Sequence, residues 1–128
     1  MPVDVNFLDD GAGVELIISG ATTGKENIEA NSKLYTKETL SRLKYKIIDR
    51  TACTEYRITS EEIQLLAQQN IQASRINNKF IIVFVSPTPE QYGMTRMWQV
   101  YVEESYLRTE IFKDRQSANE FISKNIMY

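Results

Sequence analysis

Residues 80–85 read Phe80-Ile81-Ile82-Val83-Phe84-Val85, the longest uninterrupted apolar run in the chain. Most of these residues are β-branched or aromatic, which favours a strand. Because no position is polar, the pattern is typical of a parallel strand that is covered on both faces. We therefore expect this run at the centre of a parallel β-sheet, and the rest of the fold can be predicted outward from it.

A helix is predicted directly after this strand. Thr88, Pro89 and Gln91 offer a hydroxyl cap, a proline suited to the first helical turn and a reciprocal side-chain cap. Tyr92 and Arg96 fall outside the apolar stripe of this helix, so they are predicted to be exposed. The stripe expected to face the sheet consists of Met94, Met97, Trp98, Tyr101 and Val102.

The C-terminal region predicts an edge strand and a last helix. Residues 107–112 alternate between apolar and polar side chains, as a strand with one wet face does. Asp114 can cap a final helix that turns Ala118, Phe121 and Ile122 inward.

The region before the apolar run predicts a strand, a loop and a helix. Residues 45–48 are rich in apolar side chains and are followed by Asp49, which indicates a central strand that ends there. Residues 51–58 lack helical periodicity and are predicted to form a loop. Thr59 and Glu62 have the spacing of a capping box, so a helix should start there and end near Asn77.

The N-terminal region predicts a β-hairpin followed by helices. Residues 3–7 and 14–18 alternate in polarity, and residues 9–13 between them form a glycine-containing turn. That turn precedes a strand and lacks the spacing of a phosphate-binding loop, so no nucleotide site is expected there. Thr23 and Glu26 then have the spacing of another capping box, which predicts a helix.

The predicted order of elements is ββαβαβαβα, with a second short helical stretch over residues 37–43. Strands that alternate with helices indicate right-handed crossovers and a mostly parallel sheet with helices packed on it, here with an N-terminal hairpin. The chain is of the α/β class. Its length of 128 residues fits a single domain over residues 1–128.

The composition excludes several classes of function. The chain has no histidine and one cysteine, so a Cys/His metal site and an intramolecular disulfide are excluded, and we expect no metal or cofactor. The net charge is -2 without a clustered basic face, so no nucleic-acid partner is expected. The longest apolar run is too short for a transmembrane segment and no basic leader is seen, so a cytoplasmic location is predicted.

Four local stretches carry a resemblance to a known family. The chain resembles the SpoIIAA-like branch of the STAS domain superfamily, which implies a bacterial, non-catalytic regulatory domain with a protein partner. The resemblance lies in residues 46–51, 80–85, 92–97 and 111–114.

The resemblance also implies a position for a regulatory phosphate. Some STAS relatives are phosphorylated on a Ser of an Asp-Ser-Ser-Gly signature, at the start of the helix after the third strand. The equivalent stretch here is Thr59, Ser60, Glu61 and Glu62, which has neither that Asp nor that Gly. A phosphate on Ser60 would face two carboxylates. Helix capping by itself explains a hydroxyl at Thr59 or Ser60, so the pattern favours capping, with phosphorylation as the alternative.

A ligand or partner surface is predicted after the central strand. Asp49 is expected near the edge at which open α/β sheets bind ligands. Arg50, Glu55, Tyr56 and Arg57 belong to the predicted loop beside it and could form one polar surface. The alternative is an Asp that bonds loop amides beside ordinary solvated charges.

The stretch from Tyr92 to Trp98 has two interpretations. It is either core packing, or an interface in which Tyr92 and Arg96 are exposed and through which a homodimer could form.

A second hypothesis for function is the sensing of a small apolar ligand or metabolite between the sheet and the Met/Trp/Tyr helix. A third is an enzyme that uses Asp49 with Glu55 or a tyrosine. A reactive Cys53 would need a nearby cation.

Overall fold

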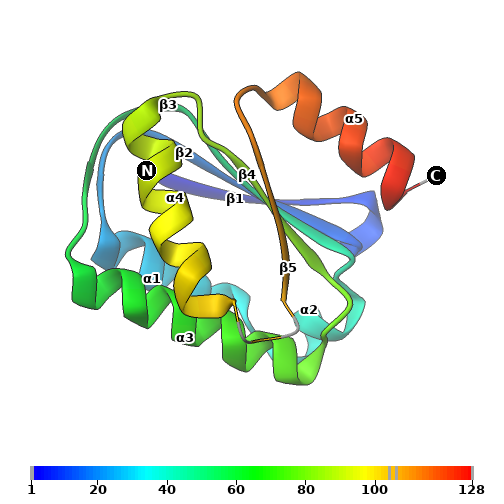
Figure 1. Ribbon diagram of the computed structural model, residues 1–128. Helices are drawn as coiled ribbons and strands as arrows, with labels where there is room; N and C mark the ends of the chain where they lie inside the picture. Colours follow the sequence, from blue (N-terminus) through cyan, green and yellow to red (C-terminus); the bar gives the residue numbers. More distant parts are fainter. Residues whose placement is uncertain (1, 104, 106, 128) are drawn as a thin grey trace.

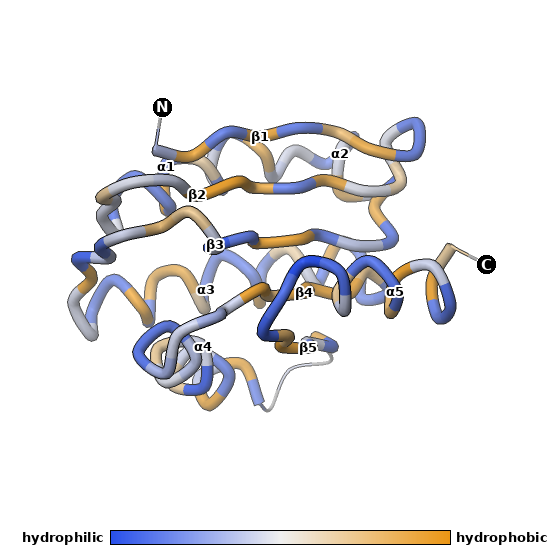
Figure 2. Tube along the Cα trace, turned by 90° about the horizontal axis from the view of Figure 1, so that it is seen from above, coloured by the Kyte–Doolittle hydropathy of each residue, from blue (hydrophilic) through white to orange (hydrophobic). Residues whose placement is uncertain are grey.

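The computed structural model describes residues 2–103, 105 and 107–127. They form one five-stranded sheet in the order β1-β2-β3-β4-β5, which Figure 2 shows from above. β1 runs antiparallel to β2, and the other neighbouring pairs are parallel. The strands are β1 (Val3–Leu8), β2 (Gly13–Thr23), β3 (Tyr45–Arg57), β4 (Ile81–Val85) and β5 (Arg108–Phe112). The predicted hairpin and mostly parallel sheet are confirmed.

Helices cover both faces of this sheet (Figure 1). α1 to α4 lie on one face over the larger apolar core, and α5 packs against the other face over a smaller one. Within the described ranges, no helix has the length and apolar character needed to cross a membrane. The helices are η1 (Asp9–Gly11), α1 (Gly24–Leu34), α2 (Lys37–Arg42), α3 (Ser60–Ile76), α4 (Pro89–Val102) and α5 (Arg115–Asn125).

Side-chain caps fix where the helices begin, as predicted. Capping boxes join Thr23 to Glu26, Thr59 to Glu62, and Thr88 to Gln91. Each satisfies backbone N–H groups that the first helical turn leaves free. Because α1, α3 and α4 directly follow β2, β3 and β4, their N-termini lie at the carboxyl edge of the parallel strands.

The prediction of a loop over residues 51–58 was wrong. β3 continues to Arg57, paired with β2 as far as Thr23↔Arg57, while its pairing with β4 stops at Asp49↔Val85. Asp49 is therefore the last residue of β3 that pairs with β4, but it does not end the strand. We call residues 51–57 the β3 arm. Most of its side chains are exposed, so it is held by backbone pairing with β2 and not by burial of an apolar face.

The β3 arm carries an irregularity at the point where it leaves β4. Ile17 pairs with Asp49 and Ser19 with Ala52, so Arg50 and Thr51 lie opposite the single residue Ile18. A bulge of this kind bends a strand and redirects its side chains.

Two further expectations are corrected. β3 is the central strand in the sheet order, while the wholly buried β4 is its neighbour.

The buried stripe of α4 differs from the predicted one. Met97 and Tyr101 are 46% and 41% exposed. Polar residues replace them in the stripe because their side chains are hydrogen-bonded there. The buried residues are Gln91, Thr95, Trp98 and Val102.

Candidate functional site

A buried cation lies between the sheet and α4. The side chain of Arg50 comes from the β3 bulge, and the residue is only 6% exposed. Its Nη1 donates to Thr95 Oγ1 at 3.0 Å. Its guanidinium carbon lies 4.9 Å from the ring centre of Tyr56 and 5.5 Å from that of Phe84. Burial lowers the pKa of Arg50 below its usual range, but a guanidinium stays charged at neutral pH.

Two polar groups beside this cation are unsatisfied. Within the described part of the chain, Arg50 Nε and the Tyr56 hydroxyl are buried without a hydrogen-bond partner. Both residues line an internal cavity of about 30 Å³, together with Ile63, Phe84, Met94 and Trp98. Buried polar groups are nearly always hydrogen-bonded, so this pair indicates a site built to receive another polar group.

An outer pocket of about 390 Å³ adjoins this cavity between the β3 arm and the start of α4. Tyr56 and Met94 line both spaces. The remaining wall of the outer pocket comes from Cys53, Thr54, Glu55, Thr88, Pro89, Glu90 and Gln91.

A polar network holds the β3 bulge against α4. Thr95 donates its hydroxyl to the carbonyl of Gln91 at 2.9 Å, and its hydroxyl lies 3.1 Å from that of Ser86. Gln91 Nε2 donates to the carbonyls of Arg50 at 3.2 Å and Cys53 at 3.4 Å. Because these contacts fix Arg50 from both backbone and side chain, the guanidinium is held in one position.

Asp49 lies on the opposite face of the sheet. Its Oδ1 accepts from the Thr51 backbone N–H at 2.9 Å and hydroxyl at 2.6 Å, and its Oδ2 accepts from Arg115 of α5 at 3.0 Å. Arg115 also pairs with Glu15. Burial opposes ionisation of Asp49, but the bonds from Thr51 and Arg115 leave its pKa below the usual 3.8.

The predicted single polar surface is therefore corrected. Asp49 and Arg50 are buried on different faces, and Tyr56 turns inward to Arg50. Only Glu55 and Arg57 are exposed members, and they pair with each other at 2.9 Å. The enzyme hypothesis that pairs Asp49 with Glu55 would require the two carboxylates to lie together. Instead, Asp49 bonds Arg115 and Glu55 bonds Arg57.

Neither the Cys53 thiol nor a cluster of metal-binding side chains supports a catalytic site in the described residues. Burial raises the pKa of the Cys53 thiol, although Arg50 nearby acts in the opposite direction, so the thiolate is disfavoured. In the described ranges, no cluster of three or more Cys, Asp or Glu side chains could hold a metal ion.

Thr59 and Ser60 lie at the start of α3. Thr59 Oγ1 accepts from the Glu62 backbone N–H at 3.1 Å, and the Glu62 carboxylate accepts from the Thr59 N–H at 2.9 Å. Capping therefore accounts for Thr59. Ser60 is the exposed first residue of the helix, and its phosphorylation stays a prediction.

The outer face of α4 is apolar and exposed. Tyr92, Met97, Val100 and Tyr101 are 45%, 46%, 63% and 41% exposed. Arg96 is also exposed, and its Nη1 donates to Gln99 at 2.6 Å. Tyr92 and Arg96 are thus at the surface, as predicted. Large apolar side chains gathered on one exposed helical face are typical of an interaction surface.

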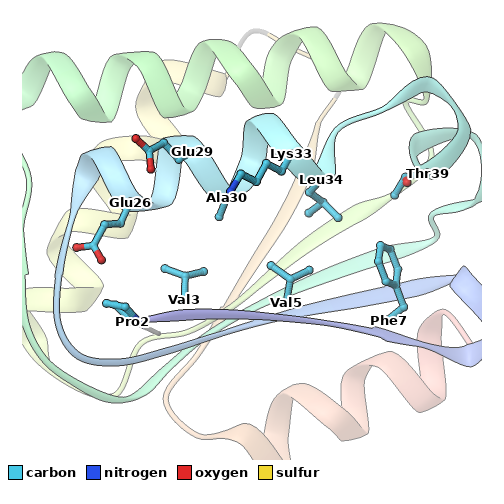
Figure 3. A pocket seen from close by; sticks show the side chains of 10 residues that line it. All are labelled: Pro2, Val3, Val5, Phe7, Glu26, Glu29, Ala30, Lys33, Leu34 and Thr39. Atoms are coloured by element: carbon cyan, nitrogen blue, oxygen red, sulfur yellow. The ribbon is translucent and has the colours of Figure 1, made fainter.

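A second apolar surface lies between β1 and α1, where a groove has a volume of about 530 Å³. Figure 3 shows Val3, Val5 and Phe7 pointing from β1 toward Ala30 and Leu34 of α1. Phe7 is 55% exposed because the helices cover this outermost strand incompletely.

Lys46 was missed as a residue of interest from the sequence. It is fully buried on the face of β3 that α1 to α4 cover, where Nζ donates to Asn31 Oδ1 and to the Tyr35 hydroxyl, both at 2.7 Å. No carboxylate of the described residues pairs with it, and burial lowers its pKa to about 7. The available signal was its place between Tyr45 and Ile47 in a strand predicted to be central.

The fold is similar to two solved structures. The anti-sigma factor antagonist SpoIIAA in its unphosphorylated form matches with a TM-score of 0.65 and 9% identity, over 97% of this chain and 99% of that one. An uncharacterized DUF3478-family protein with a SpoIIAA-like fold from Shewanella loihica PV-4 matches with a TM-score of 0.53 and 16% identity, over 93% and 90%. No protein-family model and no curated protein sequence matches the chain. The predicted SpoIIAA-like fold is confirmed.

Proposed function

We propose that this chain is a non-catalytic regulatory domain that binds a protein partner through the outer face of α4. The observation that carries the proposal is the gathering of Tyr92, Met97, Val100 and Tyr101, each more than 40% exposed, on one helix. Aromatic and Met side chains supply much of the binding energy at protein interfaces. Arg96 is the basic residue on the same face, which favours a partner that offers an apolar groove with a carboxylate at its rim.

The fold supports a regulatory role by analogy. SpoIIAA is an anti-sigma factor antagonist, so a chain of this fold can act by binding another protein. The phospho-switch is not part of the proposal, because Thr59 is a capping residue and Ser60 is followed by Glu61 and Glu62. The absence of catalysis is proposed on the grounds that Asp49 is engaged by Arg115 and that burial favours the neutral thiol of Cys53.

Affinity capture from the source cells tests this function. The wild-type bait should recover a reproducible partner, and the double variant Met97→Asp/Val100→Asp should lose it. Ile76→Asp is a matched control, because Ile76 is 52% exposed on α3. Loss of the partner in the Ile76 variant alone, or equal recovery by all three baits, would count against the α4 surface.

The homodimer is the alternative occupant of this face. Light scattering on purified chain distinguishes it: a dimer that the Met97→Asp/Val100→Asp variant dissociates would assign the face to a second copy. A second function, the sensing of a small ligand, is favoured by a different observation, the unsatisfied polar groups of Arg50 and Tyr56.

A further inference from the structure

We propose that Arg50 and Tyr56 bind the carboxylate of a small monocarboxylic acid, whose body lies in the outer pocket between the β3 arm and α4. This binding site goes beyond the proposed protein-interaction function and does not use the outer face of α4. The ligand proposed here is an anion, whereas the ligand expected from the sequence was a small apolar molecule between the sheet and the Met/Trp/Tyr helix.

Arg50 is a buried charge whose ion-pair partner is not supplied by the described residues. A guanidinium removed from water is costly unless an anion or a full set of hydrogen-bond acceptors compensates it. Here two aromatic rings and the hydroxyl of Thr95 are its partners, and within the described ranges no Asp or Glu forms an ion pair with it. An anion bound beside Arg50 would compensate this charge.

The geometry of the donors selects a carboxylate. Thr95 engages Nη1, so the remaining edge of the guanidinium is the one that carries Nε and Nη2. Arginine binds the two oxygens of a carboxylate side-on through such an edge. The Tyr56 hydroxyl is a further donor for the same oxygens. The cavity has a volume of about 30 Å³, so it is too small for a whole organic molecule and only the head group would enter it.

The route into this cavity passes Met94 and Tyr56, which line both spaces. Met is unbranched and adapts its shape readily, so a small displacement of its side chain would join the two. The body of the acid then occupies the outer pocket of about 390 Å³.

The charges at the outer pocket restrict what the body can be. Glu55 is neutralised by Arg57, while Glu90 is exposed on the rim. A phosphate dianion or a dicarboxylate carries two negative charges and would be repelled by Glu90 more strongly than a monocarboxylate, whose body is uncharged. The site should therefore prefer short monocarboxylates to phosphate.

Fluorescence of Trp98 provides the test, because it is the chain's single tryptophan and lines the cavity. Sodium butyrate should change the emission saturably, while sodium chloride at equal ionic strength and sodium phosphate should not. Tyr56→Phe removes one hydroxyl and should weaken butyrate binding about five-fold. Arg50→Met should abolish binding. The control Arg75→Gln, at an exposed position of α3 that lines neither the cavity nor the outer pocket, should bind as wild type does.

Circular dichroism should first show that each variant folds. If Arg50→Met does not fold, Tyr56→Phe and the Arg50 Nε–H resonance of the wild-type chain keep the test decisive, since butyrate should shift that resonance downfield. An unchanged resonance, a response no larger than that to chloride, or equal binding of phosphate would overturn the proposal.

Discussion

Asp49 and Arg50 are consecutive residues of β3 whose side chains serve opposite layers of the molecule. Asp49 accepts a hydrogen bond from Arg115 of α5 at 3.0 Å, and Arg50 donates one to Thr95 of α4 at 3.0 Å. The alternation of a strand separates them, although they are adjacent in the chain. Asp49 therefore helps to hold α5 on the sheet, whereas the guanidinium of Arg50 lines the cavity under α4.

Asp49→Asn should lower the free energy of unfolding at pH 7 by about 1–2 kcal/mol, because the charge-assisted bond to Arg115 is lost. The lowered pKa of Asp49 also makes its contribution pH-dependent. The contribution is present above the unfolded pKa near 3.8 and is lost as the pH falls through the folded pKa. Urea unfolding at pH 7 and in acid checks this, with the exposed Asp4→Asn as control. Equal acid sensitivity of Asp49→Asn and wild type would contradict it.

Lys46 should make the protein more stable as the pH rises from about 7 toward about 10. Burial lowers its pKa from 10.5 to about 7, so in this window the unfolded chain binds more protons than the folded one. The free energy of unfolding then rises by up to about 1.4 kcal/mol per pH unit. Below pH 7 both states are protonated and the slope disappears.

Lys46→Met should remove this rise, while Lys44→Met, at an exposed neighbouring position, should keep it. Urea denaturation at several pH values measures the slope for each chain. A wild-type stability that is flat or falls between pH 7 and 9 would show that the buried ammonium is not deprotonated on folding.

Two glycine substitutions should act in opposite directions. A Cβ on Gly13 would overlap the ring of Tyr45, whose hydroxyl donates to Asp9, so Gly13→Ala should destabilise the chain by about 1–3 kcal/mol. A Cβ on Gly93 meets no atom within 4 Å, and the residue lies in α4. Gly93→Ala should therefore stabilise by about 0.5–1 kcal/mol. Thermal melting ranks the two, and a melting temperature raised by Gly13→Ala would refute the close contact.

Thr59→Ala and Ser60→Ala separate capping from regulation. Thr59→Ala removes the acceptor for the Glu62 N–H and should cost about 1 kcal/mol of stability. Ser60→Ala should change stability by less than about 0.5 kcal/mol, as at other exposed sites. Denaturant unfolding gives both values, and phosphate found on Ser60 by mass spectrometry of native protein would restore the switch that the proposed function leaves out.

Much of the fold could be predicted because its signals are local. The apolar run at 80–85 fixed a covered strand, and the Thr-x-x-Glu/Gln spacings fixed the starts of α1, α3 and α4. The β3 arm could not be predicted in this way. Its stability comes from pairing with residues 19–23, more than 30 residues away in the chain, and its side chains are mostly exposed.

The candidate site was predicted only in part. Arg50, Tyr56 and Asp49 were selected from the sequence, but their separation onto two faces depends on strand alternation and the bulge at Arg50. Thr95 and Gln91 were missed because a polar residue on a buried helical stripe looks like a surface residue until its bonding partner is known. Their four-residue spacing, continued at Trp98 and Val102, was the signal available.

Photo-crosslinking in living source cells tests the claim of a protein-binding α4 face most directly. A benzophenone amino acid replaces Val100, which is 63% exposed on α4, or Ile76, which is 52% exposed on α3. We expect a discrete crosslinked adduct from position 100 and none from position 76. An adduct from position 76 alone, or none from position 100 in cells where the chain is expressed, would contradict it.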